Sequence, residues 1–288
     1  MADTVGDIVG QVCRIPAADG YPLAADVFRS PAAGKGTVII NAATAVHRRF
    51  YRHFAGALAN AGYDAITYDY RGIGGSRPES LRGFAANAID WGLLDMAGVV
   101  DWVRQEQGAE RVFLVGHSIG GQVAGMLPNQ DAVDGMLTVS AQSGHWRLQG
   151  EEQKWLAMLH VHLTLPVLAY VFGYMPWSWY SGAEDLPKGV ALDWARWCRD
   201  RKYLLGDDSL PLDRFSSFRA PVLAYSFSDD KWGTPQAVDE MMAVYPNVER
   251  RHVEPAQFDV SRIGHFGYFR RSASRLWNDA IGWFDRTG

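Results

Sequence analysis

The chain has 288 residues, of which 48% are hydrophobic and 21% are charged. This length suffices for one large domain, or for one domain that carries an insertion. A formal net charge of -4 offers no electrostatic case for nucleic-acid binding. The N-terminal sequence lacks an export signal and the two cysteines are too few for a disulfide framework, so a cytoplasmic location is expected.

The first 144 residues begin with two strand patterns and then alternate between strand and helix. Short apolar runs followed by amphipathic segments are typical of a mostly parallel sheet that helices cover on both faces. The strands are expected at residues 9–15, 23–28, 37–41, 64–69, 112–115 and 136–140, and the helices at 50–61, 88–107 and 119–127.

The alternation stops near residue 144 and resumes near residue 219. Residues 145–218 hold six of the eleven tryptophans and no convincing strand pattern. Beyond them, strands are expected at 221–226 and 248–253, and helices at 235–244 and 270–284. We therefore expect an α/β core made of residues 1–144 and 219–288, with residues 145–218 inserted as a helical, tryptophan-rich cap.

One segment of the predicted cap, residues 155–183, contains no Asp, Glu, Lys or Arg. Its length and apolarity would suffice for a membrane span. However, two short helical pieces are expected, because the segment is broken by His160, His162, Pro166, Gly173 and Pro176. It also interrupts a soluble fold, so no stable span is expected. The two histidines have no third ligand at a fitting spacing, so we expect neither a metal site nor a cofactor.

The stretch RVFLVGHSIGGQVAG, residues 111–125, places Ser118 between glycines directly after an apolar run. A Gly-x-Ser-x-Gly pattern between a strand and a helix is typical of a strained turn that lifts the serine hydroxyl clear of the sheet. Gly116 and Gly120 remove Cβ atoms where the strand and the helix would collide. Ser118 is therefore a candidate nucleophile, the alternative being a serine that only caps a glycine-rich turn.

A serine nucleophile needs a base, and the base needs an acid that orients it. His265 lies in a glycine-flanked loop between the last strand and the last helix, at the edge where sites of parallel α/β folds collect. His117 is adjacent to the serine but leaves the turn in a different direction, which makes it a poor base. Asp229 and Asp230 both follow the strand at 221–226, and one of them could serve only to cap the turn.

These motifs resemble those of the α/β-hydrolase superfamily, over nearly the whole chain. The resemblance is greatest to bacterial serine hydrolases similar to monoglyceride lipases and serine aminopeptidases. It implies the chain order Ser, Asp, His, selects Asp230 over Asp229 as the acid, and gives Asp69 and Arg71 a structural role. The matching pieces are GHSIGG at 116–121, DYRGIGGS at 69–76, SDDKWGTP at 228–235 and IGHFGYFR at 263–270.

The oxyanion hole of such enzymes needs two backbone N–H groups. Ile119, which follows the nucleophile, supplies the first. Family members commonly carry His-Gly after the third strand, whereas this chain has the sequence NAATAV at 41–46. Thr44 is the expected second donor and Ala43 the alternative, since a backbone donor requires no particular side chain.

The apolar cap is expected to determine the substrate. Its residues Trp155, Leu159, Leu163 and Trp177 are candidates for lining a substrate pocket. The same kind of residue could instead pack the cap against the sheet, form the interface of a homodimer, or form a lid that touches lipid. An aminopeptidase would need cap acids to hold the substrate ammonium; the cap offers Glu151, Glu152, Glu184 and Asp185, an ordinary number for a surface.

The leading functional hypothesis is a serine hydrolase that cleaves a carboxylic ester, thioester or lactone of a hydrophobic acid through an acyl-enzyme. An acyltransferase or perhydrolase would use the same acyl-enzyme with a different acceptor. A non-catalytic ligand receptor is the alternative outside enzymes. Dehalogenase and epoxide hydrolase chemistry is disfavoured, because relatives with those activities use a carboxylate nucleophile where Ser118 stands.

Overall fold

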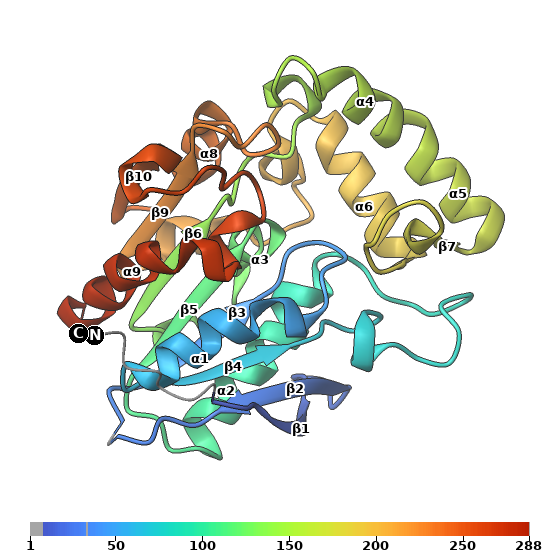
Figure 1. Ribbon diagram of the computed structural model, residues 1–288. Coiled ribbons are helices and arrows are strands. Elements are labelled where there is room, and N and C mark those ends of the chain that lie inside the picture. The colour runs from blue at the N-terminus through green and yellow to red at the C-terminus, as the bar shows by residue number, and fades with distance from the viewer. Residues whose placement is uncertain (1–7, 33, 288) are drawn as a thin grey trace.

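The computed structural model describes residues 8–32 and 34–287. An eight-stranded sheet forms its centre, in the order β1-β2-β4-β3-β5-β6-β9-β10 (Figure 1). Pairs β1–β2 and β2–β4 are antiparallel and the other five are parallel, which confirms the predicted mostly parallel sheet. The strands are β1 (Gln11–Pro16), β2 (Pro22–Phe28), β3 (Thr37–Asn41), β4 (Asp64–Tyr68), β5 (Val112–His117), β6 (Gly135–Val139), β9 (Val222–Phe227) and β10 (Val248–Val253).

Helices lie on both faces of this sheet. In the view of Figure 1, α1 (Arg52–Asn60) and α9 (Ser274–Arg286) lie in front of the sheet, and α2 (Ala97–Gln105) lies behind it. A further helix, α8 (Pro235–Met242), connects β9 to β10. Since parallel strands require such crossover connections, the helices bury both faces of the sheet.

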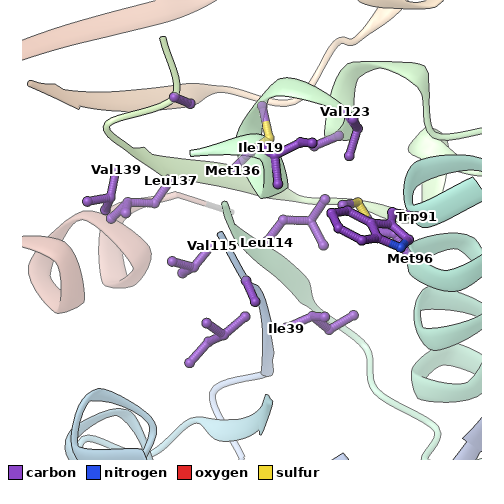
Figure 2. Packing of buried hydrophobic residues seen from close by; sticks show 14 of the residues in the cluster. Ile39, Trp91, Met96, Leu114, Val115, Ile119, Val123, Met136, Leu137 and Val139 are labelled. Atoms are coloured by element: carbon purple, nitrogen blue, oxygen red, sulfur yellow. The ribbon is translucent and has the colours of Figure 1, made fainter. Parts of the chain in front are cut away.

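The core follows the two-residue period of the central strands. Leu114 and Val115 are neighbours in β5 and point to opposite faces (Figure 2). On one face, Leu114 packs in a cluster with Trp91 and Met96 from the segment that leads into α2. All four of these side chains are fully buried. The near-continuous apolar runs at the centre of the sheet thus supply both layers of the core.

The predicted helix at residues 119–127 is shorter in the structure. It forms α3 (Ile119–Gln122), followed by a 3-10 turn (Ala124–Met126). Gly125 explains part of this difference: a Cβ atom at this position would lie only 2.1 Å from the ring of Phe215. The chain needs a glycine for this close approach, and glycine is a poor helix former.

Residues 145–218 contain helices α4 (Lys154–Leu159), α5 (Leu165–Phe172), α6 (Lys188–Arg199) and α7 (Asp213–Ser217). They also contain one short antiparallel pair, β7 (Tyr174–Met175) with β8 (Leu186–Pro187), which the sequence pattern did not predict. Figure 1 shows α4, α5 and α6 together, set apart from the sheet and beyond one end of it.

The predicted break at His160, His162 and Pro166 is wrong, whereas the predicted break at Gly173 is found. A π-helical turn (His160–Thr164) joins α4 to α5, and Gly173 ends α5 in the left-handed conformation at φ 79°. Pro166 is tolerated because it lies in the first turn of α5, directly after this change in hydrogen-bond register. The resulting helix, Lys154–Phe172, is the one helix in the described ranges that is long and apolar enough to cross a membrane, and 22% of its most apolar window is buried.

Candidate active site

Ser118 occupies a strained turn at the end of β5. Its backbone dihedrals are φ 52° and ψ -120°, a combination that non-glycine residues adopt only when their surroundings enforce it. Two close contacts enforce it: a Cβ atom on Gly116 would lie 2.4 Å from Gly121, and one on Gly120 would lie 2.4 Å from the carbonyl oxygen of Asn41. The strand and the following helix can approach this closely because these positions carry no side chain.

His265 and Asp230 form a hydrogen-bonded pair beside this turn. Nδ1 of His265 lies 2.9 Å from Oδ2 of Asp230, and both side chains are largely buried. The carboxylate can only accept, so Nδ1 carries the proton and leaves Nε2 of the neutral ring as an acceptor. Burial favours a higher pKa for Asp230, but the charge and hydrogen bond of His265, with a further hydrogen bond from the backbone of Gly233, outweigh it and lower that pKa.

Asp229, the neighbouring carboxylate, has a different set of partners. Its two oxygens accept the backbone N–H groups of Ile263 and Gly264 at 2.8 and 2.9 Å. Gly264 has a positive φ of 54°, so the loop bends sharply directly before His265. Asp229 therefore positions the histidine loop, while Asp230 binds the imidazole ring. The spacing of the two residues in the sequence could not separate these roles.

His117, which the sequence analysis set aside as a base, connects three parts of the site. Its Nε2 lies 2.8 Å from the backbone carbonyl of His265, and its Nδ1 lies 2.8 Å from the hydroxyl of Tyr51. That hydroxyl in turn accepts the N–H of Ala43 at 2.8 Å. Since the carbonyl of His265 can only accept, Nε2 carries the proton and Tyr51 donates to Nδ1. Burial lowers the pKa of His117 to about 3, so the ring stays neutral.

The same contacts distinguish the two candidates for the second oxyanion donor. The N–H of Ala43 is already bound to Tyr51. Thr44 follows it and lines the same cavity as Ser118. Within residues 8–32 and 34–287, no hydrogen bond uses the N–H of Thr44 or that of Ile119. The geometry thus favours the predicted pair, Ile119 and Thr44, over Ala43.

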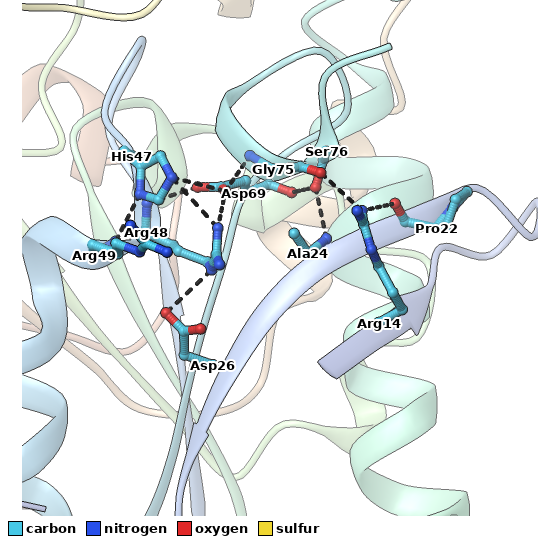
Figure 3. A network of polar contacts seen from close by, with 10 residues as sticks. All are labelled: Arg14, Pro22, Ala24, Asp26, His47, Arg48, Arg49, Asp69, Gly75 and Ser76. Carbon is cyan, nitrogen blue, oxygen red and sulfur yellow. Dashed lines mark hydrogen bonds and ion pairs between the residues drawn. The ribbon is translucent and has the colours of Figure 1, made fainter. Parts of the chain in front are cut away.

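A buried ionic network supports the loop that carries Thr44. Asp69 accepts the backbone N–H of Arg48 at 2.7 Å and that of Gly75 at 2.8 Å (Figure 3). The Arg48 side chain lies between Asp69 and Asp26, and all three residues are less than a tenth exposed. This is consistent with the structural role that the resemblance implies for Asp69.

A cavity of about 660 Å³ opens over the serine, and it is lined by Ser118, His265, Thr44 and Trp177 together with other residues of both the sheet edge and segment 145–218. Of the predicted substrate-binding residues, only Trp177 lines it. Trp155, Leu159 and Leu163 do not: they are 61%, 47% and 54% exposed. Those three positions repeat every four residues, so they share one face of the helix Lys154–Phe172, and this face is turned away from the cavity.

Within the described part of the chain, no three His, Cys, Asp or Glu side chains are grouped so that they could hold a metal ion. His160 and His162 therefore have no third ligand there. The chemistry of the cavity must be judged from the serine, the histidine and the carboxylate that surround it.

An eight-stranded, mostly parallel sheet with a serine in a strained turn after its central strand defines an α/β-hydrolase. Residues 32–191, more than half of the chain, match the profile of the serine aminopeptidase S33 family, and the protein belongs to that family of hydrolases. Epoxide hydrolase A of Mycobacterium tuberculosis (strain ATCC 25618 / H37Rv) is 39% identical over 79 residues. That match spans 27% of this chain and 22% of the relative's length.

Solved structures share the fold along almost the whole chain. A soluble variant of monoglyceride lipase from Saccharomyces cerevisiae has a TM-score of 0.73 at 13% identity, with 100% of this chain and 99% of that chain covered. A thermophilic esterase from Thermogutta terrifontis has a TM-score of 0.61 at 16% identity, with 96% and 98% covered. At these identities the likeness concerns the fold.

Proposed function

We propose that this protein is a serine hydrolase that cleaves a carboxylic ester, thioester or lactone of a hydrophobic acid. The observation that carries the proposal is the pairing of His265 with Asp230 at 2.9 Å beside the strained Ser118, in one cavity. A residue that only caps a turn needs neither a strained backbone nor a neighbouring histidine oriented by a buried carboxylate.

The proposed mechanism follows from the proton positions. Nε2 of His265 takes the hydroxyl proton of Ser118 while Oγ attacks the acyl carbonyl, and the oxyanion binds the N–H groups of Ile119 and Thr44. Collapse of this tetrahedral intermediate expels the alcohol or thiol, which takes the proton from His265 and leaves an acyl-serine. Water then attacks the acyl-serine with His265 as the base, and the acid departs. Asp230 stabilises the imidazolium at both stages.

The walls of the cavity support a hydrophobic substrate. Five aromatic side chains from the core and from segment 145–218 contribute to them: Phe50, Trp177, Trp194, Trp232 and Phe266. Rings of this kind favour apolar or aromatic acyl groups, because burying such a group removes its surface from water.

The first experiment measures initial hydrolysis rates of p-nitrophenyl esters of increasing acyl length, with Ser118→Ala as the control. We expect serine-dependent turnover that rises with acyl length. Labelling by a fluorophosphonate, read out by intact mass, should add one adduct to the wild type and none to Ser118→Ala. Full activity of Ser118→Ala would refute the proposal. Added alcohol or hydrogen peroxide would reveal an acyltransferase or perhydrolase through the ester or peracid formed.

One contact favours a second candidate, an aminopeptidase. Among the acidic residues of segment 145–218, Glu184 alone lines the cavity, and its backbone N–H donates to the carbonyl of Ala45 at 2.9 Å. A carboxylate there could bind a substrate ammonium group. Asp185 is instead held by Arg77 at 3.0 Å. Turnover of amino-acid p-nitroanilides that disappears in Glu184→Gln, with ester turnover retained, would establish this activity; no turnover of any anilide would exclude it.

A further inference from the structure

Two buried glutamines lie in the wall of the cavity that contains Ser118. Gln122 is 2% exposed and Gln142 is 7% exposed. Burying an amide in an apolar site is costly unless its N–H and C=O groups find partners. An amide group of these two side chains that lacks a partner in the protein therefore indicates which polar group the cavity could bind.

The orientation of Gln122 follows from its neighbours. Its Nε2 lies 2.7 Å from the backbone carbonyl of Gln142, which can only accept, so the amide nitrogen must face that carbonyl. Its Oε1 then faces the hydroxyl of Tyr203, which donates to it at 2.8 Å. Gln122 is also tied to the nucleophile turn, because its backbone N–H donates to the carbonyl of Ser118 at 3.1 Å. The reversed amide would bring two carbonyl oxygens together.

This orientation in turn sets that of Gln142. Nε2 of Gln122 lies 3.5 Å from Oε1 of Gln142, so the acceptor end of the second amide faces the first. Its Nε2 is left as the other end, and no hydrogen bond with any of the residues 8–32 and 34–287 uses it. Gln149, in the same wall, has a buried Oε1 that lacks a partner among those residues. This part of the wall thus holds side-chain amide atoms that no described residue uses, beside the aromatic side chains of the cavity.

We propose that Gln142 forms a polar subsite, whose amide N–H groups bind an oxygen atom of the substrate other than the oxygens of the scissile ester. The substrate class is accordingly an ester, thioester or lactone with a second oxygen function, such as a hydroxyl, ether or carbonyl group, on its hydrophobic part. This inference rests on the proposed function, because the position of the subsite has meaning only relative to Ser118. The expected substrate is thus an ester with an oxygenated hydrophobic part and not one with a purely aliphatic acyl group.

The test compares p-nitrophenyl heptanoate with three esters in which an ether oxygen replaces the methylene at position 3, 4 or 5. An ether accepts a hydrogen bond, has nearly the size of a methylene and cannot lactonise. We expect kcat/KM for one of the three to exceed that for heptanoate by about five- to tenfold in the wild type, the worth of one hydrogen bond. This preference should disappear in Gln142→Met, which keeps the volume and removes the donors.

Three controls make the comparison sharp. The inductive effect of the ether on the ester is the same for every variant, so the ratio of wild type to variant removes it. Gln236→Met, at an exposed position of α8, makes the same chemical change away from the cavity and should keep the preference. If Gln142→Met does not fold, Gln142→Glu removes the donors while keeping the shape, and it should reverse the preference.

The outcomes separate this proposal from the one on which it rests. Hydrolysis without preference at any position, or a preference that persists in both Gln142 variants, overturns the subsite and leaves the hydrolase intact. If no ester is hydrolysed, binding of heptanoic acid and of its three ether analogues to Ser118→Ala is measured by tryptophan fluorescence. Equal affinities for all four acids would overturn the subsite independently of catalysis.

Discussion

The buried His117 makes the stability of this protein depend on pH in a way that can be calculated. The pKa of His117 is lowered by burial from 6.5 to about 3, so the unfolded chain binds a proton before the folded one does. Stability from this group is therefore fully present above the unfolded value and is lost as the pH falls toward the folded one. Between pH 7.5 and pH 5 the loss is roughly 2 kcal/mol.

Replacing His117 by leucine should remove this dependence. At pH 7.5 the variant should be less stable by about 2–4 kcal/mol, because the hydroxyl of Tyr51 and the carbonyl of His265 lose their buried partner. At pH 5 the gap between wild type and variant should narrow by roughly 2 kcal/mol, since only the wild type loses the contribution of the histidine.

Urea unfolding of the full chain, followed by tryptophan fluorescence at both pH values, measures the gap directly. Other titrating groups are common to both proteins. The change in the stability difference between pH 7.5 and pH 5 therefore isolates the contribution of His117. The exposed His162, changed to leucine, is the matched control and should give the same small gap at both values. A His117→Leu gap of equal size at pH 7.5 and pH 5 would refute the reasoning.

Three further predictions concern activity. Ser118→Ala should lower kcat by at least about 1000-fold and leave the midpoint of thermal unfolding unchanged, as measured by ester hydrolysis and calorimetry. A lower midpoint would mean that Ser118 has a structural role. Asp230→Asn should lower kcat about 1000-fold or more. Asp229→Asn should chiefly destabilise the fold, by roughly 1–3 kcal/mol in urea unfolding. Equal losses of kcat in the two variants would contradict the separate roles of these residues. Trp177→Ala should raise KM for long acyl esters in steady-state kinetics, and Trp155→Ala should not. A raised KM in Trp155→Ala but not in Trp177→Ala would place the substrate on the exposed helix face.

The sequence pattern predicted the sheet well because the central strands are buried on both faces. Each is a short, nearly continuous apolar run, and five of the eight predicted strands begin or end at the residue that the structure shows. The turn at Ser118 was also predictable, since only glycines tolerate the approach of Gly116 to Gly121. Helix lengths were less predictable, because the end of α3 depends on Phe215, which is distant in the sequence.

The sequence pattern alone could not assign the separate roles of Asp229 and Asp230. Nor could it show which apolar side chains of segment 145–218 face the cavity. Asp229 and Asp230 are adjacent and chemically identical. The family resemblance selected Asp230 as the acid, but only the folded loop shows that Asp229 accepts backbone N–H groups while Asp230 binds an imidazole ring. Trp155 and Trp177 are equally apolar, yet one is 61% exposed and the other lines the cavity. Hydropathy does not indicate which face of a helix will find a partner.

The sequence by itself determined the order of strands and helices and the strained turn, because both depend on local sterics and on the period of apolar residues. Apart from the pair of His265 and Asp230, which the sequence and the resemblance predicted, the tertiary structure alone decided which polar groups meet. His117 joins Tyr51 to the loop of His265, and Gln122 orients Gln142, through contacts between residues that are between 20 and 148 positions apart. Such hydrogen bonds depend on distances of a few tenths of an ångström between separate elements, and no local pattern encodes those distances.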